Sequence, residues 1–506
     1  MKERRLAVID LGSNSFRLVV FTWAPGTWWK RTDEIHESVR LGQGLDASGA
    51  LQPQPMERAL ETIDLYAHFC RATGIEEIRP VATSAIRDAT NREELLARAK
   101  ARSNLDIQVL SREEEAHYGY IAVVNSTSLT DGVALDIGGG SMQLVQVEDR
   151  RQLDARSWPL GAVRMTERFL PDDKAKKSQL DALREHVRGE LESAPWLAGA
   201  GERGGSIAGI GGALRNLATA AELEGELPSF GVQGFHLRRK ELSRLVEELA
   251  DLPASERGAL PGIKKERGDL ILAAAIVVEE VMECGGFDEI ETTEEGLREG
   301  VFFSVLLEDS DPPLFESVRV ASVFNLARQY HPEPVHTDHV ARLALQLWDE
   351  LAAAGLHEGR QDERELLWAA AILHDIGTAV DYDDHHRHSR YLVLSAGLPG
   401  WSQRETVLIA QMVRYHRKGT PSLADFERLT DDGDEELLLR CAAALRLAEQ
   451  FERARDQVVK AAHVAVNDGH VDLTIEADED VTVARWAAER ASDVFERAFG
   501  KTLRVS

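Results

Sequence analysis

Two short stretches have the composition of an anion-binding turn. The first is "IDLGSNS", residues 9–15, and the second is "LDIGGGS", residues 135–141. In each, an Asp follows an apolar run, and small residues separate it from a second apolar run. Glycine allows close approach to the backbone, so that successive N–H groups can converge on one anion. We therefore predict phosphate binding by Gly12, Ser13, Asn14, Ser15, Gly138, Gly139, Gly140 and Ser141.

The repetition of this pattern is itself informative. A single Asp-x-Gly after a strand is most often only a hairpin turn. Here two copies each begin a separate α/β segment, which favours two homologous lobes that hold consecutive phosphates from both sides. Asp10 and Asp136 close the two strands and are predicted to hold Mg²⁺ directly or through water.

Three glutamates in "LSREEEA" open a predicted helix. Ser111 and Glu114 have the spacing of a capping box, which gives Glu114 a structural role. Glu115 lies roughly 100° further around the helix and can point elsewhere. Without context such a glutamate usually lies on a solvated helix face. Two further motifs are "TSAIRDA", with Arg87, and "IAGIGGALRNLA", with Gly209, Gly211 and Gly212, where close strand–helix packing is the alternative to phosphate binding.

The chain divides by pattern into four predicted parts. Residues 1–125 and 126–307 show α/β patterning, residues 318–455 are almost wholly helical, and residues 456–506 combine a hairpin around Asn467–Gly469 with one helix. The acidic, proline-bearing run at 308–317 is the predicted linker.

Composition narrows the class of protein. The chain has 506 residues, a formal net charge of -27 and three widely spaced cysteines. The charge argues against general nucleic-acid binding, the cysteines suit a reducing cytoplasm, and no apolar run is long enough to span a membrane. Basic patches around Arg238 and Arg239, Lys264 and Arg417 are solvated faces or, alternatively, local binding surfaces for a polyanion.

Several blocks resemble one family. "IDLGSNSFRLVV", "ATSAIRDATN", "LSREEEA", "LDIGGGSMQL", "GAVRMTERF", "IAGIGGALRNLA" and "EEGLREGVFF" resemble, in order and spacing, the exopolyphosphatase / guanosine pentaphosphate phosphohydrolase family. The resemblance implies two actin-like (ribonuclease H-like) α/β lobes. It also implies that Glu115 is the general base, that Arg87 binds phosphate and that Asp136 belongs to the catalytic group, with Mg²⁺ or Mn²⁺ as the cofactor.

The helical region resembles the HD-type domain of the longer family members. In that pattern a divalent metal is bound by histidines and aspartates, and the matching residues are His339, His374, Asp375 and Glu449. Glu449 stands where the pattern has Asp, which weakens the metal prediction. A structural role, extending the substrate channel or mediating dimerisation, is therefore the favoured interpretation, and a metal site is the alternative.

The resemblance implies a cytoplasmic phosphoanhydride hydrolase, with a homodimer as the expected assembly. Release of terminal phosphate from inorganic polyphosphate is the leading function, and hydrolysis of guanosine pentaphosphate is the close alternative. The alternative functions from other classes are a non-catalytic polyphosphate or alarmone sensor, a sugar kinase, and nucleotide hydrolysis in the helical domain.

Overall fold

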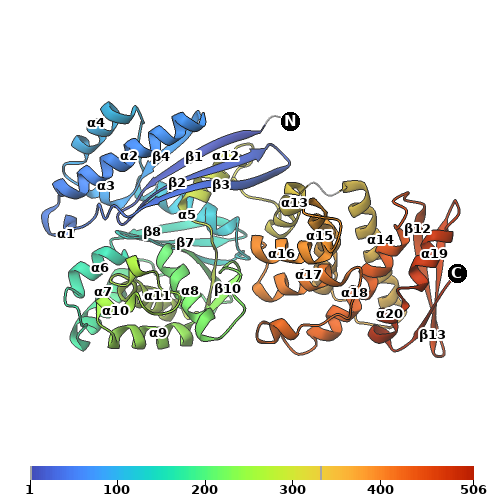
Figure 1. The fold of residues 1–506 in the computed structure, drawn as a ribbon. Helices are drawn as coiled ribbons and strands as arrows, with labels where there is room; N and C mark the ends of the chain where they lie inside the picture. The colour runs from blue at the N-terminus through green and yellow to red at the C-terminus, as the bar shows by residue number, and fades with distance from the viewer. Residues whose placement is uncertain (1–2, 331–332) are drawn as a thin grey trace. The chain divides into compact units, whose positions relative to one another are not determined.

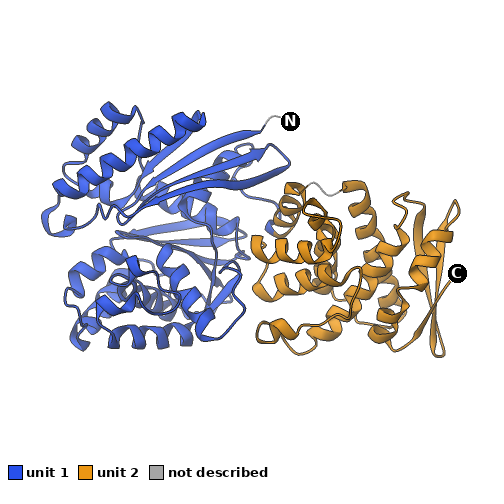
Figure 2. Cartoon of the chain, in the orientation of Figure 1, with its two compact units in different colours: residues 1–318 blue, residues 319–506 orange. Residues whose placement is uncertain are grey.

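The computed structural model describes residues 3–330 and 333–506, which form two compact units, residues 1–318 and 319–506 (Figure 2). The predicted linker at 308–317 lies against the first unit. The Asn125 side chain hydrogen-bonds to the Pro313 carbonyl and the Phe315 N–H, and the Phe315 ring stacks on Trp29 at 4.8 Å between centroids. In the described ranges no helix is both long and apolar enough to cross a bilayer.

The first lobe of unit 1 is a five-stranded sheet with helices on both faces (Figure 1). The strand order is β3-β2-β1-β4-β5, with β1 antiparallel to β2 and parallel to β4. The strands are β1 (Arg4–Leu11), β2 (Phe16–Ala24), β3 (Trp28–Glu37), β4 (Glu77–Ala82) and β5 (Gln108–Val109). The helices are α1 (Leu45–Ser48), α2 (Pro53–Thr73), α3 (Ser84–Asp88), α4 (Arg92–Ser103) and α5 (Arg112–Val124).

The second lobe repeats this topology. Its order is β10-β11-β9-β6-β7-β8, so β6, β7, β8, β9 and β11 occupy the places of β1 to β5. The strands are β6 (Gly132–Ile137), β7 (Met142–Glu148), β8 (Arg151–Trp158), β9 (Ser206–Ile210), β10 (Phe235–Arg238) and β11 (Glu289–Thr292). The helices are α6 (Ala162–Phe169), α7 (Lys177–Leu191), α8 (Gly212–Glu224), α9 (Arg239–Asp251), α10 (Ala254–Arg257), the 3₁₀ turn η1 (Lys265–Arg267), α11 (Ile271–Gly285) and α12 (Leu297–Leu306). The duplication indicated by the two turns is therefore present in the sheets.

The lobes share one core layer. Helices α5 and α12 lie between the two sheets, in a buried cluster that contains Leu6 and Val8 of β1 together with Ala134 of β6. Phe302 of α12 stacks on Phe21 of β2 with ring centroids 4.2 Å apart. Alternate residues of both sheets therefore face these two helices, Leu6 and Val8 from β1 and Ala134 from β6. This shared layer holds the turns that follow the two strands.

Unit 2 is a helical bundle with a small sheet. Its helices are α13 (Val318–Gln329), α14 (Pro334–Ala353), α15 (Gln361–Leu373), η2 (Ile376–Ala379), α16 (His385–Ala396), α17 (Gln403–Tyr415), η3 (Ala424–Leu429) and α18 (Asp434–Phe451). The predicted hairpin is present as β12 (Val459–Asn467) and β13 (His470–Ala477). The prediction of one following helix was wrong, because two short helices, α19 (Thr482–Glu489) and α20 (Ser492–Phe499), lead into a third strand, β14 (Thr502–Val505), parallel to β13.

Candidate active site

The two glycine turns lie face to face in unit 1. The first follows β1 and the second follows β6. A Cβ atom placed on Gly139 would lie 3.2 Å from Cβ of Ser13, and one placed on Gly140 would lie 2.4 Å from the Ser84 hydroxyl. The backbones approach so closely that side chains at these two glycines would collide with the opposite lobe. The glycines therefore permit the two lobes to meet at the turns.

A single cleft is lined from both lobes at this point. It brings together most of the residues predicted from the sequence, and it adds four arginines that were not predicted. The lining includes Asp10, Gly12, Ser13, Asn14, Ser15, Glu115, Asp136, Gly138, Gly139, Ser141, Gly211 and Gly212, and the arginines Arg17, Arg215, Arg267 and Arg298.

Glu115 is held in place by its helix and by two side chains. The capping box predicted for Ser111 and Glu114 is present, with the Ser111 N–H donating to the Glu114 carboxylate at 2.7 Å. Glu115 is thereby left free of the cap and is buried, with 6% of its surface exposed. One carboxylate oxygen accepts from the Ser141 hydroxyl at 3.2 Å, and the other accepts from Arg87 at 2.5 Å. Burial raises the pKa of the Glu115 carboxyl, which increases its affinity for a proton.

Arg87 is placed differently from its predicted phosphate-binding role. Its guanidinium donates to Glu115 and to the carbonyl of Leu110, at 2.5 and 3.1 Å. It does not belong to the lining of the cleft. Arg87 thus contacts the carboxylate of Glu115 from outside the lining of the cleft.

Asp10 and Asp136 both face the cleft. Asp10 forms an ion pair with Arg298 at 3.1 Å. Burial, together with the nearby carboxylates of Glu115 and Asp10, raises the pKa of Asp136 to about 7. Carboxylates in such a crowded group are stabilised by a bound cation. Mg²⁺ in phosphate sites is typically held by one or two carboxylates with substrate oxygens and waters, so these two residues fit the predicted metal.

The three glycines of the third motif, Gly209, Gly211 and Gly212, have different surroundings. Gly211 and Gly212 line the cleft at the start of α8, and Gly211 has a left-handed φ of 124°. Gly209 instead lies within β9, where an added Cβ atom would come 2.6 Å from the Leu214 side chain. The prediction that Gly209 binds phosphate was therefore wrong, because close strand–helix packing explains this glycine. Gly140 also lies outside the lining, on the side of the turn that faces Ser84.

The four arginines give the cleft its electrostatic character. Burial, together with the charges of Arg298 and Arg17, lowers the pKa of both Arg215 and Arg267 to about 10. All remain charged at neutral pH, so several cations are confined in a cleft where a polyanion would relieve their repulsion. Arg17, Arg215 and Arg298 occur within motifs already singled out, "SNSFRLVV", "GGALRNLA" and "EEGLREG", but only the fold shows that they converge.

A second, basic cavity adjoins the cleft and shares Arg17, Arg215, Arg267 and Arg298 with it. Its lining adds Arg31 and Lys264 to these four, against three carboxylates, Glu34, Glu222 and Glu294. Of the predicted basic patches, Lys264 therefore faces the cavity, whereas Arg238 and Arg239 are not in its lining. Arg417 belongs to unit 2, where its guanidinium lies over the Tyr382 ring, 5.1 Å from the centroid.

The structure brings together three of the four residues predicted for the second metal site, all of them in unit 2. His374, Asp375 and Glu449 lie together, with Nε2 of His374 3.3 Å from Glu449 and 3.7 Å from Asp375. The other histidine of the cluster is His336, whose Nε2 lies 3.2 Å from Glu449. His339 was wrongly chosen, because its Nε2 lies 2.9 Å from the Val459 carbonyl, outside this group.

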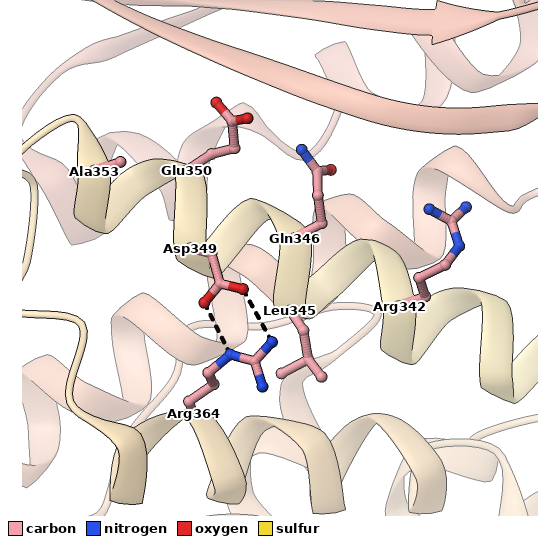
Figure 3. Close-up of a pocket in the computed structure, with 7 residues that line it drawn as sticks. All are labelled: Arg342, Leu345, Gln346, Asp349, Glu350, Ala353 and Arg364. Atoms are coloured by element: carbon pink, nitrogen blue, oxygen red, sulfur yellow. Dashed lines mark hydrogen bonds and ion pairs between the residues drawn. The ribbon is translucent and has the colours of Figure 1, made fainter.

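A hollow on the surface of unit 2 has a structural explanation. It runs along α14 and is lined by Arg342, Leu345, Gln346, Asp349, Glu350, Ala353 and Arg364 (Figure 3). Asp349 and Arg364 form a two-point ion pair at 2.8 and 2.9 Å. Gln346 and Glu350 hydrogen-bond to the backbone of β12. These polar side chains join α14 to its neighbours.

Solved structures similar to this chain match 60–61% of its length. A Ppx/GppA family member from Aquifex aeolicus is 27% identical, with a TM-score of 0.53, and the match covers 61% of this chain and 99% of that one. An exopolyphosphatase-like protein is 25% identical, with a TM-score of 0.54 over 60% of this chain and 100% of that one. An exopolyphosphatase from Cytophaga hutchinsonii, 24% identical with a TM-score of 0.56 over 60% and 98%, shares the fold.

Family models match both units. The model of the Ppx/GppA phosphatase family matches residues 27–309, and that of Ppx/GppA phosphatase domain III matches residues 318–488. The first match contains Arg87, Glu115, the second glycine turn and three of the four cleft arginines. The chain belongs to the Ppx/GppA phosphatase family.

Proposed function

We propose that this protein is an exopolyphosphatase, which releases the terminal phosphate of inorganic polyphosphate by attack of water. The observation that carries the proposal is the continuity of the arginine-lined cleft with the basic cavity, through four shared arginines. The cleft would hold the phosphate that is cleaved, and the cavity would hold the next phosphates of the chain. A linear polyanion needs such an extended positive surface.

The backbone of the two turns would grip the terminal phosphate. N–H groups of the turn Gly12–Ser15 and of Gly139 and Ser141 come from opposite lobes, and the Ser13 hydroxyl adds a donor. Arg298 and Arg215 would neutralise the oxygens on which charge develops. In-line attack requires that this phosphate be fixed before the water moves, so the paired turns supply the positioning.

Glu115 would act as the general base. It would accept a proton from a water in the cleft as the oxygen of that water bonds to the terminal phosphorus. The bond from phosphorus to the bridging oxygen breaks, and the electron pair leaves with the shortened chain. Arg87 and Ser141 fix the carboxylate on either side. Mg²⁺ held by Asp10 and Asp136 would supply charge neutralisation for the phosphate oxygens.

The composition of the basic cavity favours polyphosphate over guanosine pentaphosphate. Six of its lining residues are cationic. Among the described residues of its lining, the one ring is the imidazole of His36, and Val232 is the one large apolar side chain. A guanine base is usually bound by an apolar or aromatic surface with a few polar contacts. A chain of phosphates matches the cavity more closely.

The remaining parts of the proposal concern the cell and the assembly. A cytoplasmic location accords with the three unpaired cysteines, Cys70, Cys284 and Cys441. The homodimer and the HD-type character of unit 2 stay predictions from the sequence.

Phosphate release with Mg²⁺ from long polyphosphate and from guanosine pentaphosphate tests the proposal. We expect faster release from polyphosphate, and a loss of roughly 10²- to 10⁴-fold in Glu115→Gln, with polyphosphate binding retained. Glu113→Gln is the control, since Glu113 is exposed on the same helix. Far more efficient hydrolysis of guanosine pentaphosphate would overturn the choice of substrate, and full turnover by Glu115→Gln would overturn the mechanism.

A further inference from the structure

Six buried side chains converge inside unit 2. They lie on five helices or directly after them. His336 lies on α14, His374 and Asp375 follow α15, and His385 opens α16. His416 ends α17, and Glu449 lies on α18. None is more than 9% exposed. Burying so many ionisable groups together is costly unless they bind one another or a cation.

Hydrogen bonds to the backbone fix the direction of three of these imidazoles. Nδ1 of His374 lies 2.6 Å from the Ala371 carbonyl, Nδ1 of His416 lies 2.7 Å from that of Val413, and Nδ1 of His385 lies 2.9 Å from that of Tyr382. A carbonyl only accepts, so each Nδ1 carries the proton. In a neutral ring, Nε2 then offers a lone pair toward the centre of the cluster, which is the arrangement of metal-binding histidines.

The inward-facing atoms lack the partners that would satisfy them. Both nitrogens of His336, Nε2 of His374 and Oε2 of Glu449 make no hydrogen bond within the described residues, although all four atoms are buried. Nε2 of His385 and Nε2 of His416 face each other at 3.2 Å. Two lone pairs at that distance repel unless a proton or a cation lies between them.

The spacing of these atoms is that of ligands on a shared ion. At a metal–nitrogen distance of about 2.0–2.1 Å, neighbouring ligand atoms lie roughly 3.0–3.4 Å apart. Nε2 of His336 and of His374 lie 3.2 and 3.3 Å from Glu449, and Nε2 of His385 lies 3.3 Å from Asp375. The distances from Asp375 to Nε2 of His336, His374 and His416 are longer, at 3.8, 3.7 and 3.9 Å. Two groups of ligand atoms result, and Asp375 belongs to both.

We propose that unit 2 binds a pair of divalent transition-metal ions bridged by the carboxylate of Asp375. One ion is held by His336, His374, Glu449 and Asp375, and the second by Asp375, His385 and His416. Mixed imidazole and carboxylate donors suit Zn²⁺, Mn²⁺ or Fe²⁺ better than Mg²⁺. The second ion has three protein ligands, which leaves a position for water or a phosphate oxygen.

Charged neighbours of the cluster are compatible with two ions. Arg455 donates to Oδ2 of Asp375 at 2.9 Å and is 40% exposed. A carboxylate oxygen has two lone pairs, so it can accept from Arg455 while it binds an ion. Arg417 lies 3.4 Å from Nδ1 of His385, on the side of the ring opposite the cluster.

Metal content tests the proposal without relying on activity. The full chain is stripped with a chelator, loaded with Zn²⁺ or Mn²⁺, freed of excess ions and measured by mass spectrometry. We expect the wild type to retain two equivalents more than Asp375→Ala. His336→Ala and His385→Ala should each lose one equivalent. His339→Ala and His388→Ala are the matched controls on the same two helices, and both should keep the wild-type content.

Two results would overturn the metal pair. One is equal metal content in the wild type and Asp375→Ala, and the other is wild-type content in His385→Ala. Circular dichroism checks that each variant is folded. Titration of the unmutated, stripped protein with Co²⁺ is independent of any substitution. Visible absorption of histidine-bound cobalt should saturate at two equivalents, and saturation at one would refute the bridged pair.

Discussion

The cleft of unit 1 and the buried cluster of unit 2 concentrate opposite kinds of binding group. The cleft confines Arg17, Arg215, Arg267 and Arg298 around backbone N–H groups. The cluster confines carboxylates and the lone pairs of imidazoles. In the first, the unmatched charge is positive, and in the second the unmatched electron pairs are those of metal ligands. The cleft is therefore suited to a polyanion, and the cluster is suited to metal ions.

The difference also lies in how the two sites are built. In unit 1, the proposed phosphate donors are backbone N–H groups of two homologous turns, so glycine is needed where these turns meet. In unit 2, side chains from the ends and faces of several helices converge, and their backbone carbonyls orient the rings. A site of backbone amides follows from a local motif, whereas a site of side chains depends on how the helices pack.

The largest expected effect separates the two ligands directly. Tripolyphosphate with Mg²⁺ should slow amide hydrogen exchange in the turns at 12–15 and 138–141, by about 100-fold at 100 times its dissociation constant if exchange requires loss of the ligand. Zn²⁺ should instead protect residues 374–377 and 413–417. Hydrogen-exchange mass spectrometry of the full chain measures both segments in one experiment.

The same experiment contains its control. Inorganic sulfate, a small anion without a chain of phosphates, should protect the turns much less than tripolyphosphate does. If Zn²⁺ protected only the unit 1 turns, or tripolyphosphate protected the histidine segments, the contrast between an anion site and a cation site would be wrong.

A smaller effect is expected when one cation of the cleft is removed. Arg267 lines both the cleft and the basic cavity. Because hydrogen bonds to charged groups contribute about 1.5–3 kcal/mol, Arg267→Met should raise KM for polyphosphate on the order of tenfold. The dependence of KM on salt should become shallower, since fewer ions are released on binding. Steady-state kinetics at several salt concentrations measures both.

Arg238→Met is the matched control for Arg267→Met. Arg238 carries the same charge but is exposed and lies outside both linings. It should leave KM and its salt dependence unchanged. An equal change in both variants would mean that overall charge, and not the cavity, attracts the substrate.

Local motifs made the unit 1 site largely predictable from the sequence. The Asp-and-glycine turns, the capping box at Ser111 and the separate direction of Glu115 depend on residues within a few positions of one another. The duplicated sheets then follow from the duplicated turns. The four arginines were missed because they come from four different elements, and no local spacing relates Arg17 to Arg267.

Helix phase explains the error in unit 2. His336 and His339 stand three residues apart at the start of α14, about 300° of rotation, so both lie near one face of the helix. Which one enters the cluster depends on the packing of α14 against α18 and β12. His339 instead contacts the carbonyl of Val459. His385 and His416 were absent from the predicted ligands, since they belong to different helices and no local spacing relates them.

The smallest effect concerns Arg87, which lies outside the lining of the cleft and donates to Glu115. Arg87→Met should lower kcat with little change in KM, and by less than the roughly 10²- to 10⁴-fold contribution of a general base. Burial raises the pKa of Glu115, and the charge of Arg87 opposes that rise. Without Arg87 the pKa should rise further, so the acidic limb of the rate profile should move to higher pH.

The pH profile distinguishes positioning from direct phosphate binding. If Arg87 only holds Glu115, Arg87→Lys should restore the position of the acidic limb, because lysine supplies the charge, but should restore kcat only in part, since it lacks the planar fork. If Arg87 binds phosphate, KM should rise in Arg87→Met and the acidic limb should stay in place. Phosphate-release kinetics across the pH range decides between these two roles. It therefore shows whether Arg87 binds the polyphosphate itself or only holds Glu115.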